Sequence, residues 1–139
     1  MRTSNHQSRT EGRAAYAPAM ADLRVIISAR DYDETLAFYG KTLGLAIAES
    51  WDDPDGRGTV FRAADGMIEV LEANEHHPLH AVEGVRLGIE VPDAQALHDH
   101  VVAKGVAITE AIDDRPWKHR SFTIDDPNGL ALTFFHPID

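Results

Sequence analysis

The sequence contains no cysteine, no long apolar run and few basic residues. The lack of cysteine excludes disulfides, thiolate metal ligands and a cysteine nucleophile. No apolar stretch approaches the roughly 18 residues that a membrane-spanning helix needs, so we expect no membrane partner. The formal net charge of −10 argues against a nucleic-acid partner, because binding to the phosphate backbone requires a basic surface. What remains is an ordinary globular composition, and 139 residues suit one domain or two small modules.

The first 20 residues differ in composition from the rest of the chain. They contain Arg2, Arg9 and Arg13, few large apolar residues, and no apolar segment of the kind found in secretory signals. We therefore predict a flexible N-terminal arm over residues 1–21 and a cytoplasmic protein. Met20 directly precedes the first apolar segment and could be the natural start.

An internal repeat organises the remaining chain. The similar segments GLAIAE, from Gly44, and GVAITE, from Gly105, each follow a strand pattern and a helix pattern. Two further short strand patterns come after each segment, separated by turns rich in Asp, Pro and Gly. This order predicts an α+β fold of two βαβββ modules, residues 22–74 and 84–139, joined by a linker at 75–83.

Both predicted helices have clear start and stop signals. Asp31, followed three residues later by Glu34, predicts a capping box, and Gly44 predicts the end of the first helix. Asp93 and Gly105 give the same signals for the second helix. The apolar stripes of the two helices are Leu36, Tyr39, Leu43, Leu97 and Val101.

The stretch SFTIDDPNGLALTFFH, from Ser121 to His136, predicts a hairpin that closes the second module. Asp126–Gly129 suits a tight turn, because Asn and Gly tolerate the positive φ that such turns need. On either side, large apolar residues alternate with smaller or more polar ones, as in strands with one buried face.

These features resemble the vicinal oxygen chelate superfamily. The resemblance rests on the two modules, on LAFYGKTLGL in the first helix and on DDPNGLALTFF at the end, and it covers residues 22–136. The superfamily includes glyoxalase I, extradiol dioxygenases, and the bleomycin and fosfomycin resistance proteins. The resemblance implies that the modules form a curved mixed sheet around a ligand cavity, with the helices on its outer face. The last hairpin would then also be a wall of the cavity.

In catalytic members of that superfamily, four strands each supply one ligand to a divalent metal. By resemblance these positions fall on Arg24, Glu69, Gly84 (with Val85 adjacent) and Thr133. Of the four only Glu69 could serve, because an arginine has no lone pair to offer and glycine has no side chain. We therefore predict no metal and no other cofactor. We predict instead an ion pair between Arg24 and Glu69, the alternative being that both charges reach solvent at the ends of the sheet.

The histidines do not suggest a second metal site. His76 and His80 flank Pro78 in the linker, where a solvated polar segment is expected. His98 and His100 lie two apart on a helix and should face different ways. For His119 and His136, near strand ends, we expect surface positions.

Strand alternation predicts which side chains face the cavity. The apolar row of the fifth strand, Val85 to Val91 in steps of two, should face the helices, which leaves Arg86 and Glu90 facing the cavity. The same phase applies to the first, fourth and last strands. The candidate ligand-binding residues are Arg24, Glu69, Arg86, Glu90, Trp117, Thr133 and Phe135.

Trp117 is included because its surroundings narrow the resemblance. Pro116, Trp117, Arg120 and Phe122, followed by the turn at Asp126, are similar to a segment of bleomycin-resistance-type proteins. Those relatives bind and sequester a flat cationic antibiotic in clefts shared by two chains. Trp117 could stack on such a ligand, or it could simply pack over the end of a strand.

Two classes of function remain. The resemblance favours a metal-free homodimer that binds and sequesters a small organic, antibiotic-like molecule without catalysis. The alternative is a lyase, isomerase or dioxygenase of the same superfamily, with Glu69 as general base or metal ligand. The sequence leaves open which ligand binds, and whether the modules pair within one chain or exchange between two.

Overall fold

The computed structural model describes residues 15–139 and has the predicted module order twice. The first module consists of β1 (Arg24–Ala29), α1 (Tyr32–Ala37), the π-helix η1 (Phe38–Thr42), β2 (Ile47–Asp53), β3 (Gly56–Ala63) and β4 (Gly66–Glu72). The second consists of β5 (Arg86–Glu90), α2 (Ala94–Ala103), β6 (Glu110–Asp114), β7 (His119–Asp125) and β8 (Ala131–Pro137). The predicted α+β fold of two βαβββ modules is confirmed. Residues 1–14 of the predicted arm lie outside the described residues, and residues 15–21 are exposed without regular structure.

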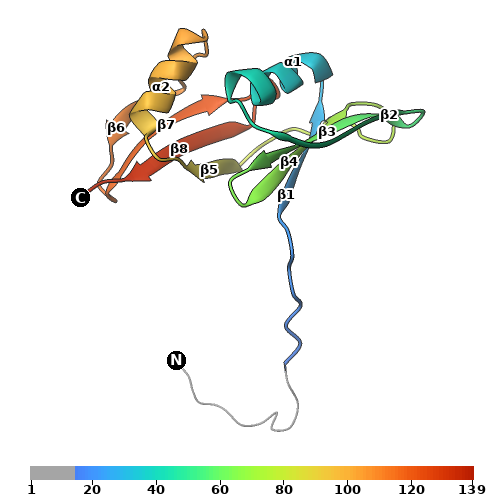
Figure 1. Cartoon of the computed structure of the whole chain (residues 1–139), viewed down its shortest axis with the longest axis horizontal. Coiled ribbons are helices and arrows are strands. Elements are labelled where there is room, and N and C mark those ends of the chain that lie inside the picture. The colour runs from blue at the N-terminus through green and yellow to red at the C-terminus, as the bar shows by residue number, and fades with distance from the viewer. Residues whose placement is uncertain (1–14) are drawn as a thin grey trace.

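The eight strands form two mixed sheets of the same topology. Their orders are β1-β4-β3-β2 and β5-β8-β7-β6, and in each sheet the first pair is parallel and the others antiparallel. Figure 1 shows the sheets side by side, with α1 and α2 on the same side of both. The opposite side, here termed the open face of each sheet, carries no helix within residues 15–139. None of the described helices is long and apolar enough to cross a membrane.

One hydrophobic core lies between the helices and the two sheets. It draws on both modules, because large apolar side chains on the helix-facing side of every central strand pack against the helices. Its fully buried members include Tyr39, Phe61, Ile68, Val101, Phe122, Ile124 and Leu132. The two modules therefore share a single core and leave their open faces free of it.

The helix signals in the sequence correspond to real caps. Asp31 Oδ1 accepts a hydrogen bond from Glu34 N, and Asp93 Oδ1 accepts one from Ala96 N, both at 3.0 Å. Gly44 and Gly105 adopt φ of +72° and +85° just after the helices, as predicted for glycine at such ends. The first helix is not a continuous α-helix, however, because it widens into η1. Adjacent Phe38 and Tyr39 are both buried there.

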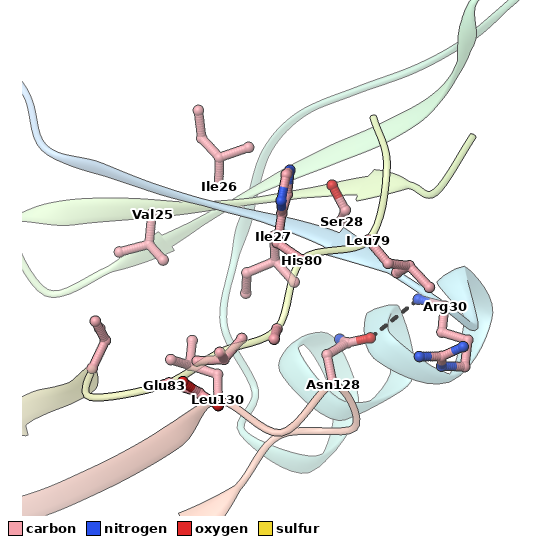
Figure 2. Close-up of a pocket in the computed structure, with 13 residues that line it drawn as sticks. Val25, Ile26, Ile27, Ser28, Arg30, Leu79, His80, Glu83, Asn128 and Leu130 are labelled. Carbon is pink, nitrogen blue, oxygen red and sulfur yellow. Dashed lines mark hydrogen bonds between the residues drawn. The ribbon is translucent and has the colours of Figure 1, made fainter. Parts of the chain in front are cut away.

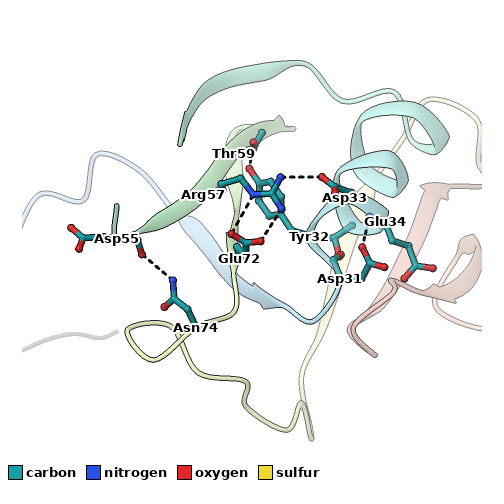
Figure 3. A network of polar contacts seen from close by, with 10 residues as sticks. Asp31, Tyr32, Asp33, Glu34, Asp55, Arg57, Thr59, Glu72 and Asn74 are labelled. Atoms are coloured by element: carbon teal, nitrogen blue, oxygen red, sulfur yellow. Dashed lines mark hydrogen bonds and ion pairs between the residues drawn. The ribbon is translucent and has the colours of Figure 1, made fainter. Parts of the chain in front are cut away.

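A network centred on Arg57 fixes α1 over the first sheet (Figure 3). Arg57 donates to both carboxylate oxygens of Glu72, at 2.7 and 3.2 Å, and to Asp33 of α1 at 3.3 Å. Its guanidinium also lies 4.5 Å from the centre of the Tyr32 ring. The hydrogen bond from Arg57 lowers the pKa of Glu72. The Tyr32 hydroxyl in turn bonds Thr59 at 2.7 Å, so β3, β4 and α1 are tied together.

The last turn joins the two modules. The Asp126 carboxylate, 4% exposed, accepts hydrogen bonds from Tyr39 Oη at 2.7 Å and from the backbone N–H groups of Asn128 and Leu130. Burial, with the nearby Asp126 carboxylate, raises the pKa of Tyr39. The predicted hairpin is confirmed, with Gly129 at φ +88°. Its turn anchors the second module to the helix of the first, a role that no local pattern indicated.

The predicted start of the fifth strand is wrong. The resemblance puts Gly84 at its start, but Gly84 has φ +69°, in the left-handed region rather than the extended one, and β5 begins at Arg86. Val85 was placed in the row that faces the helices, yet it is 61% exposed. The rest of that row, Leu87, Ile89 and Val91, does pack against the core.

Candidate functional site

Three rows of side chains cross the open face of the first sheet, because strand pairing places partner residues side by side on one face. From β1 to β2 the rows are Arg24, Met67 and Arg62; Ile26, Glu69, Val60 and Glu49; and Ser28, Leu71, Gly58 and Trp51. Ile26, in the middle row on the edge strand β1, is 61% exposed. The open face therefore mixes apolar and acidic side chains in its middle row, with two arginines in the row on one side of it and an indole in the row on the other.

Arg24 and Glu69 form the predicted ion pair. Arg24 Nη1 donates to Glu69 Oε1 at 2.9 Å, and its Nη2 lies 3.7 Å from Asp22. The hydrogen bond to Glu69, with the nearby carboxylates of Asp22 and Glu49, raises the pKa of Arg24 despite the opposing effect of desolvation. The Glu69 side chain is only 14% exposed, so the paired carboxylate is largely shielded from solvent. The alternative that both charges reach solvent separately is wrong.

The open face of the second sheet carries the remaining strand residues that alternation predicted. Its rows are Arg86, Ala131 and Asp125; Gly88, Thr133, Thr123 and Glu110; and Glu90, Phe135, Ser121 and Asp113. Thr123 Oγ1 donates to Glu110 at 3.0 Å and lies 2.8 Å from Thr133 Oγ1, so the Thr133 hydroxyl donates to it. The ring of Phe135 stacks on His119 with centroids 4.4 Å apart.

A cavity of 220 Å³ lies between the two sheets. Its lining includes Met67, Gly88 and Glu90 of the open faces together with Val25, Ile68 and Leu87 of the helix-facing sides. Alternation thus placed Arg24, Glu69, Arg86, Glu90, Thr133 and Phe135 on the correct faces. Whether they bind a ligand stays a prediction.

The positions that the resemblance assigns to a metal do not suit a divalent cation. Strand register gives Arg86, rather than Gly84, the place in the second sheet that Arg24 has in the first. One metal position in each sheet is therefore an arginine, Arg24 in the first and Arg86 in the second. The other two positions already have partners, because Glu69 is hydrogen-bonded to Arg24 and Thr133 to Thr123. Among residues 15–139, no group of three or more His, Asp or Glu could hold a metal ion. The absence of a metal stays a prediction.

Trp117 lies apart from these rows. It is 64% exposed in the loop between β6 and β7, next to Lys118 at φ +70°. Trp117 is therefore not buried by packing over the end of a strand. Its stacking on a ligand stays a prediction.

Trp51 is the residue that the sequence analysis missed. It shares the open face of the first sheet with the ion pair and lies over Gly58, its partner in β3. The sequence does contain a signal for this pairing. In a hairpin with its turn at Asp53–Gly56, the residues on either side of the turn pair in order. Asp52 is then opposite Arg57, and Trp51 is opposite Gly58.

The turn of the last hairpin forms one wall of a second cavity (Figure 2), and its role as a wall of a ligand site stays a prediction. The volume of this cavity is 310 Å³, and it lies between β1, residues 79–83 of the linker with Val85, and the turn before β8. Ile27 and Leu130 contribute apolar surface, and Arg30, His80 and Asn128 contribute polar groups. Asn128 Oδ1 accepts a hydrogen bond from Arg30 N at 3.1 Å, which fixes the turn against the end of β1.

Three of the described histidines, His98, His100 and His136, have structural partners. Ala94 N donates to His136 Nδ1 at 2.8 Å, so His136 helps to satisfy the start of α2. His98 packs edge-on against Phe122, whereas His100 reaches the Thr42 carbonyl of the first module, so the two face different ways as predicted.

Solved structures of similar shape include an antibiotic binding protein and an enzyme. TnmS3, an antibiotic binding protein from Streptomyces sp. CB03234, has a TM-score of 0.71 and 19% identity, over 88% of this chain and 99% of that one. TioX from Micromonospora sp. ML1 has a TM-score of 0.67 and 16% identity, over 86% and 98%. A lactoylglutathione lyase from Agrobacterium tumefaciens has a TM-score of 0.65 and 20% identity, over 86% and 96%. At such identities these likenesses establish the fold alone.

Sequence comparison gives the family. No curated protein matches the chain. The family model described as Glyoxalase/Bleomycin resistance protein/Dioxygenase superfamily matches residues 23–134, which span both modules. The chain therefore belongs to the Glyoxalase/Bleomycin resistance protein/Dioxygenase superfamily.

Proposed function

We propose that this protein binds and sequesters a small organic, antibiotic-like molecule, without a metal and without chemistry, in a cleft between two copies of the chain. The observation that carries the proposal is the 2.9 Å ion pair between Arg24 and Glu69. It occupies the place where catalytic members of the superfamily hold their metal. A protein that retains this fold but fills the metal position with a guanidinium is suited to binding rather than to Lewis-acid catalysis.

The ion pair also argues against Glu69 as a general base. A base must be free to take a proton from its substrate, within hydrogen-bond reach. Here Oε1 already accepts a charge-assisted hydrogen bond, and the side chain is largely covered. Arg24 would have to move before this oxygen could accept a proton or bind a metal.

The open faces offer the mixed surface that small-molecule sites need. Binding sites are mostly apolar with a few placed polar groups, and Ile26 and Phe135 lie among Arg24, Glu69 and Thr133 on these faces. A face with Ile26 61% exposed is one that a ligand or a second chain would cover with a gain in stability. TnmS3, which has a similar structure, is an antibiotic binding protein, and this supports the proposal.

Metal analysis tests the first part of the proposal. Protein purified without chelator should contain less than stoichiometric metal, and calorimetric titration with Mn²⁺, Ni²⁺ and Zn²⁺ should give no binding that depends on Glu69. The Glu69→Gln variant is the matched control, because it removes the charge but keeps the shape. One metal per chain, lost in Glu69→Gln, would contradict the proposal and favour the lyase, isomerase or dioxygenase alternative.

Recovery of the ligand tests the second part. Compounds that raise the melting temperature in a library screen should be incubated with excess protein, released by denaturation and analysed by mass spectrometry. We expect them to return unchanged. A product that wild type forms and Glu69→Gln does not would establish an enzyme.

A further inference from the structure

The indole of Trp51 lies on the backbone of Gly58, its partner in β3. A Cβ added at Gly58 would lie 2.1, 2.4 and 2.8 Å from Cζ2, Cε2 and Cη2 of Trp51, far inside van der Waals contact. The six-membered ring therefore covers the backbone of β3 at this point. A glycine inside a strand weakens it and commonly marks a close approach, and here the approaching group is the indole.

The same arrangement leaves part of the indole accessible. Trp51 is only partly buried, although its ring lies against β3 on one side. Leu71, which lies beyond Gly58 in the same row, is 7% exposed although it is on the open face. A flat apolar platform with a buried underside is thus present one row from Ile26 and Glu69.

The open face that carries this platform has three acidic side chains against two basic ones, and the acid Glu49 is near Trp51 on the same strand. Glu49 lies two residues from Trp51 on β2, in the row of Glu69. Together with Asp22 these acids outnumber the basic groups of the face, Arg24 and Arg62. A negatively charged ligand would meet like charge here, whereas a positively charged ring would be attracted both to the indole and to the acids.

We propose that Trp51, held against Gly58, is the surface on which a planar ring system of the ligand stacks, and that the acids beside it select against a negatively charged ring. The inference rests on the proposed small-molecule binding, and it assigns the stacking role to Trp51 rather than to Trp117. Because Gly58 has no side chain, the indole lies directly on the backbone of β3. Gly58 therefore determines how close to the sheet a stacked ligand ring can lie.

The two tryptophans of the chain make a direct test simple. Proflavine, a planar cation, and anthraquinone-2-sulfonate, a planar anion, are titrated into wild type, Trp51→Val and Trp117→Val, with calorimetry giving the dissociation constants. Proflavine should bind about tenfold more weakly to Trp51→Val, the loss expected for one stacking contact, and within about twofold of wild type to Trp117→Val. The anion should bind wild type at least tenfold more weakly than the cation.

A second measurement needs no variant. Each indole N–H gives one signal in a ¹H–¹⁵N NMR spectrum, so proflavine should shift the Trp51 signal and leave that of Trp117 in place. This remains decisive if Trp51→Val fails to fold.

Several outcomes would overturn the inference. One is that wild type binds neither probe at 1 mM. Another is that Trp117→Val, rather than Trp51→Val, loses affinity for proflavine. A third is that the anion binds as tightly as the cation. None of these contradicts sequestration, which library compounds recovered unchanged would still support. Conversely, turnover of a bound compound would refute sequestration while leaving the role of Trp51 intact.

Discussion

Gly58 shows how one missing side chain can set the shape of a site. In a strand, alanine in place of glycine normally costs little or stabilises, because glycine loses more backbone entropy on folding. At Gly58 the added carbon would overlap the Trp51 ring, so either the indole or the strand must shift. The same substitution should therefore have opposite effects at two open-face glycines.

We predict that Gly58→Ala lowers the free energy of unfolding by about 1–3 kcal/mol, the usual cost of overpacking. Gly88→Ala is the matched control, since a Cβ there meets only Phe135 Cε1, at 3.8 Å, and we expect no loss. In a Trp51→Val background the cost of Gly58→Ala should fall below about 0.5 kcal/mol, because the clash is gone. Urea denaturation of the four variants and wild type measures this coupling, and an undiminished cost in the double variant would show that the indole is not the obstacle.

The metal positions permit a gain-of-function test at the same scale. Arg24→His, Arg86→His and Thr133→Glu, combined with the native Glu69, would supply two imidazoles and two carboxylates, a set that suits Zn²⁺ and Ni²⁺. We expect the triple variant to bind one Zn²⁺ per chain at micromolar or tighter affinity. Arg24→His alone should not. Calorimetry distinguishes the two, and an equally weak triple variant would mean that these four positions do not converge.

Among the elements, the helix and turn that join the modules make a pH-dependent contribution. Tyr39 Oη donates to the buried Asp126 carboxylate at 2.7 Å, and the pKa of Tyr39 is raised above its unfolded value of about 10. The stability from this protonated hydroxyl is fully present below pH 10. It is lost as the pH rises further, because the unfolded chain then gives up the proton while the folded chain keeps it.

We therefore predict that Tyr39→Phe costs about 1.5–3 kcal/mol at pH 7, typical of a hydrogen bond to a charged group. The difference from wild type should narrow above pH 10, by up to about 1.4 kcal/mol per pH unit. Urea denaturation between pH 7 and 11 gives the two curves. Tyr16→Phe, at a position 89% exposed, controls for general effects of alkali. A gap that stays constant to pH 11 would refute the assignment.

The elements also show why some features were readable from the sequence and others were not. Caps at Asp31 and Asp93, and the turn at Asp126–Gly129, depend on residues within four positions of one another, so local patterns suffice. The face of Trp51 was hidden by an irregularity. The register of β2 shifts between Ile47 and Glu49. Ile47 is opposite Phe61, on the side that faces the helices, whereas Glu49 is opposite Val60, on the open face. Simple alternation from Ile47 would therefore put Trp51 on the wrong side.

Contacts between distant segments were equally hidden. The link from Tyr39 to Asp126 spans 87 residues, and nothing near either residue indicates the other. The ion pair between Arg24 and Glu69 could be predicted because the resemblance to a known family placed both on facing positions. Arg86 was missed as its counterpart, since the start of β5 depends on the backbone conformation of Gly84.

For the whole molecule, the repeat has a consequence for assembly. Each module covers one face of its sheet with a helix and leaves the other face open, so a single chain has two open faces and one core (Figure 1). Exposed apolar residues such as Ile26 lie on these faces, and we predict a dimer that packs through them and covers both faces at once.

Ile26→Glu tests this arrangement. If the open face were solvated, the substitution would change the free energy of unfolding by no more than about 0.5 kcal/mol. It would also leave the molecular mass of the protein in solution, and therefore its oligomeric state, unaltered. If the face is buried between two copies, we expect the dimer dissociation constant to rise by at least about tenfold, because a charge would be buried without a partner. Val102→Glu is the matched control, since Val102 is a similar β-branched residue, 47% exposed, on α2 at the opposite side of the sheet. Sedimentation equilibrium of the three proteins at matched concentrations measures the constants, and a dimer that tolerates Glu at 26 but not at 102 would place the interface on the helices instead.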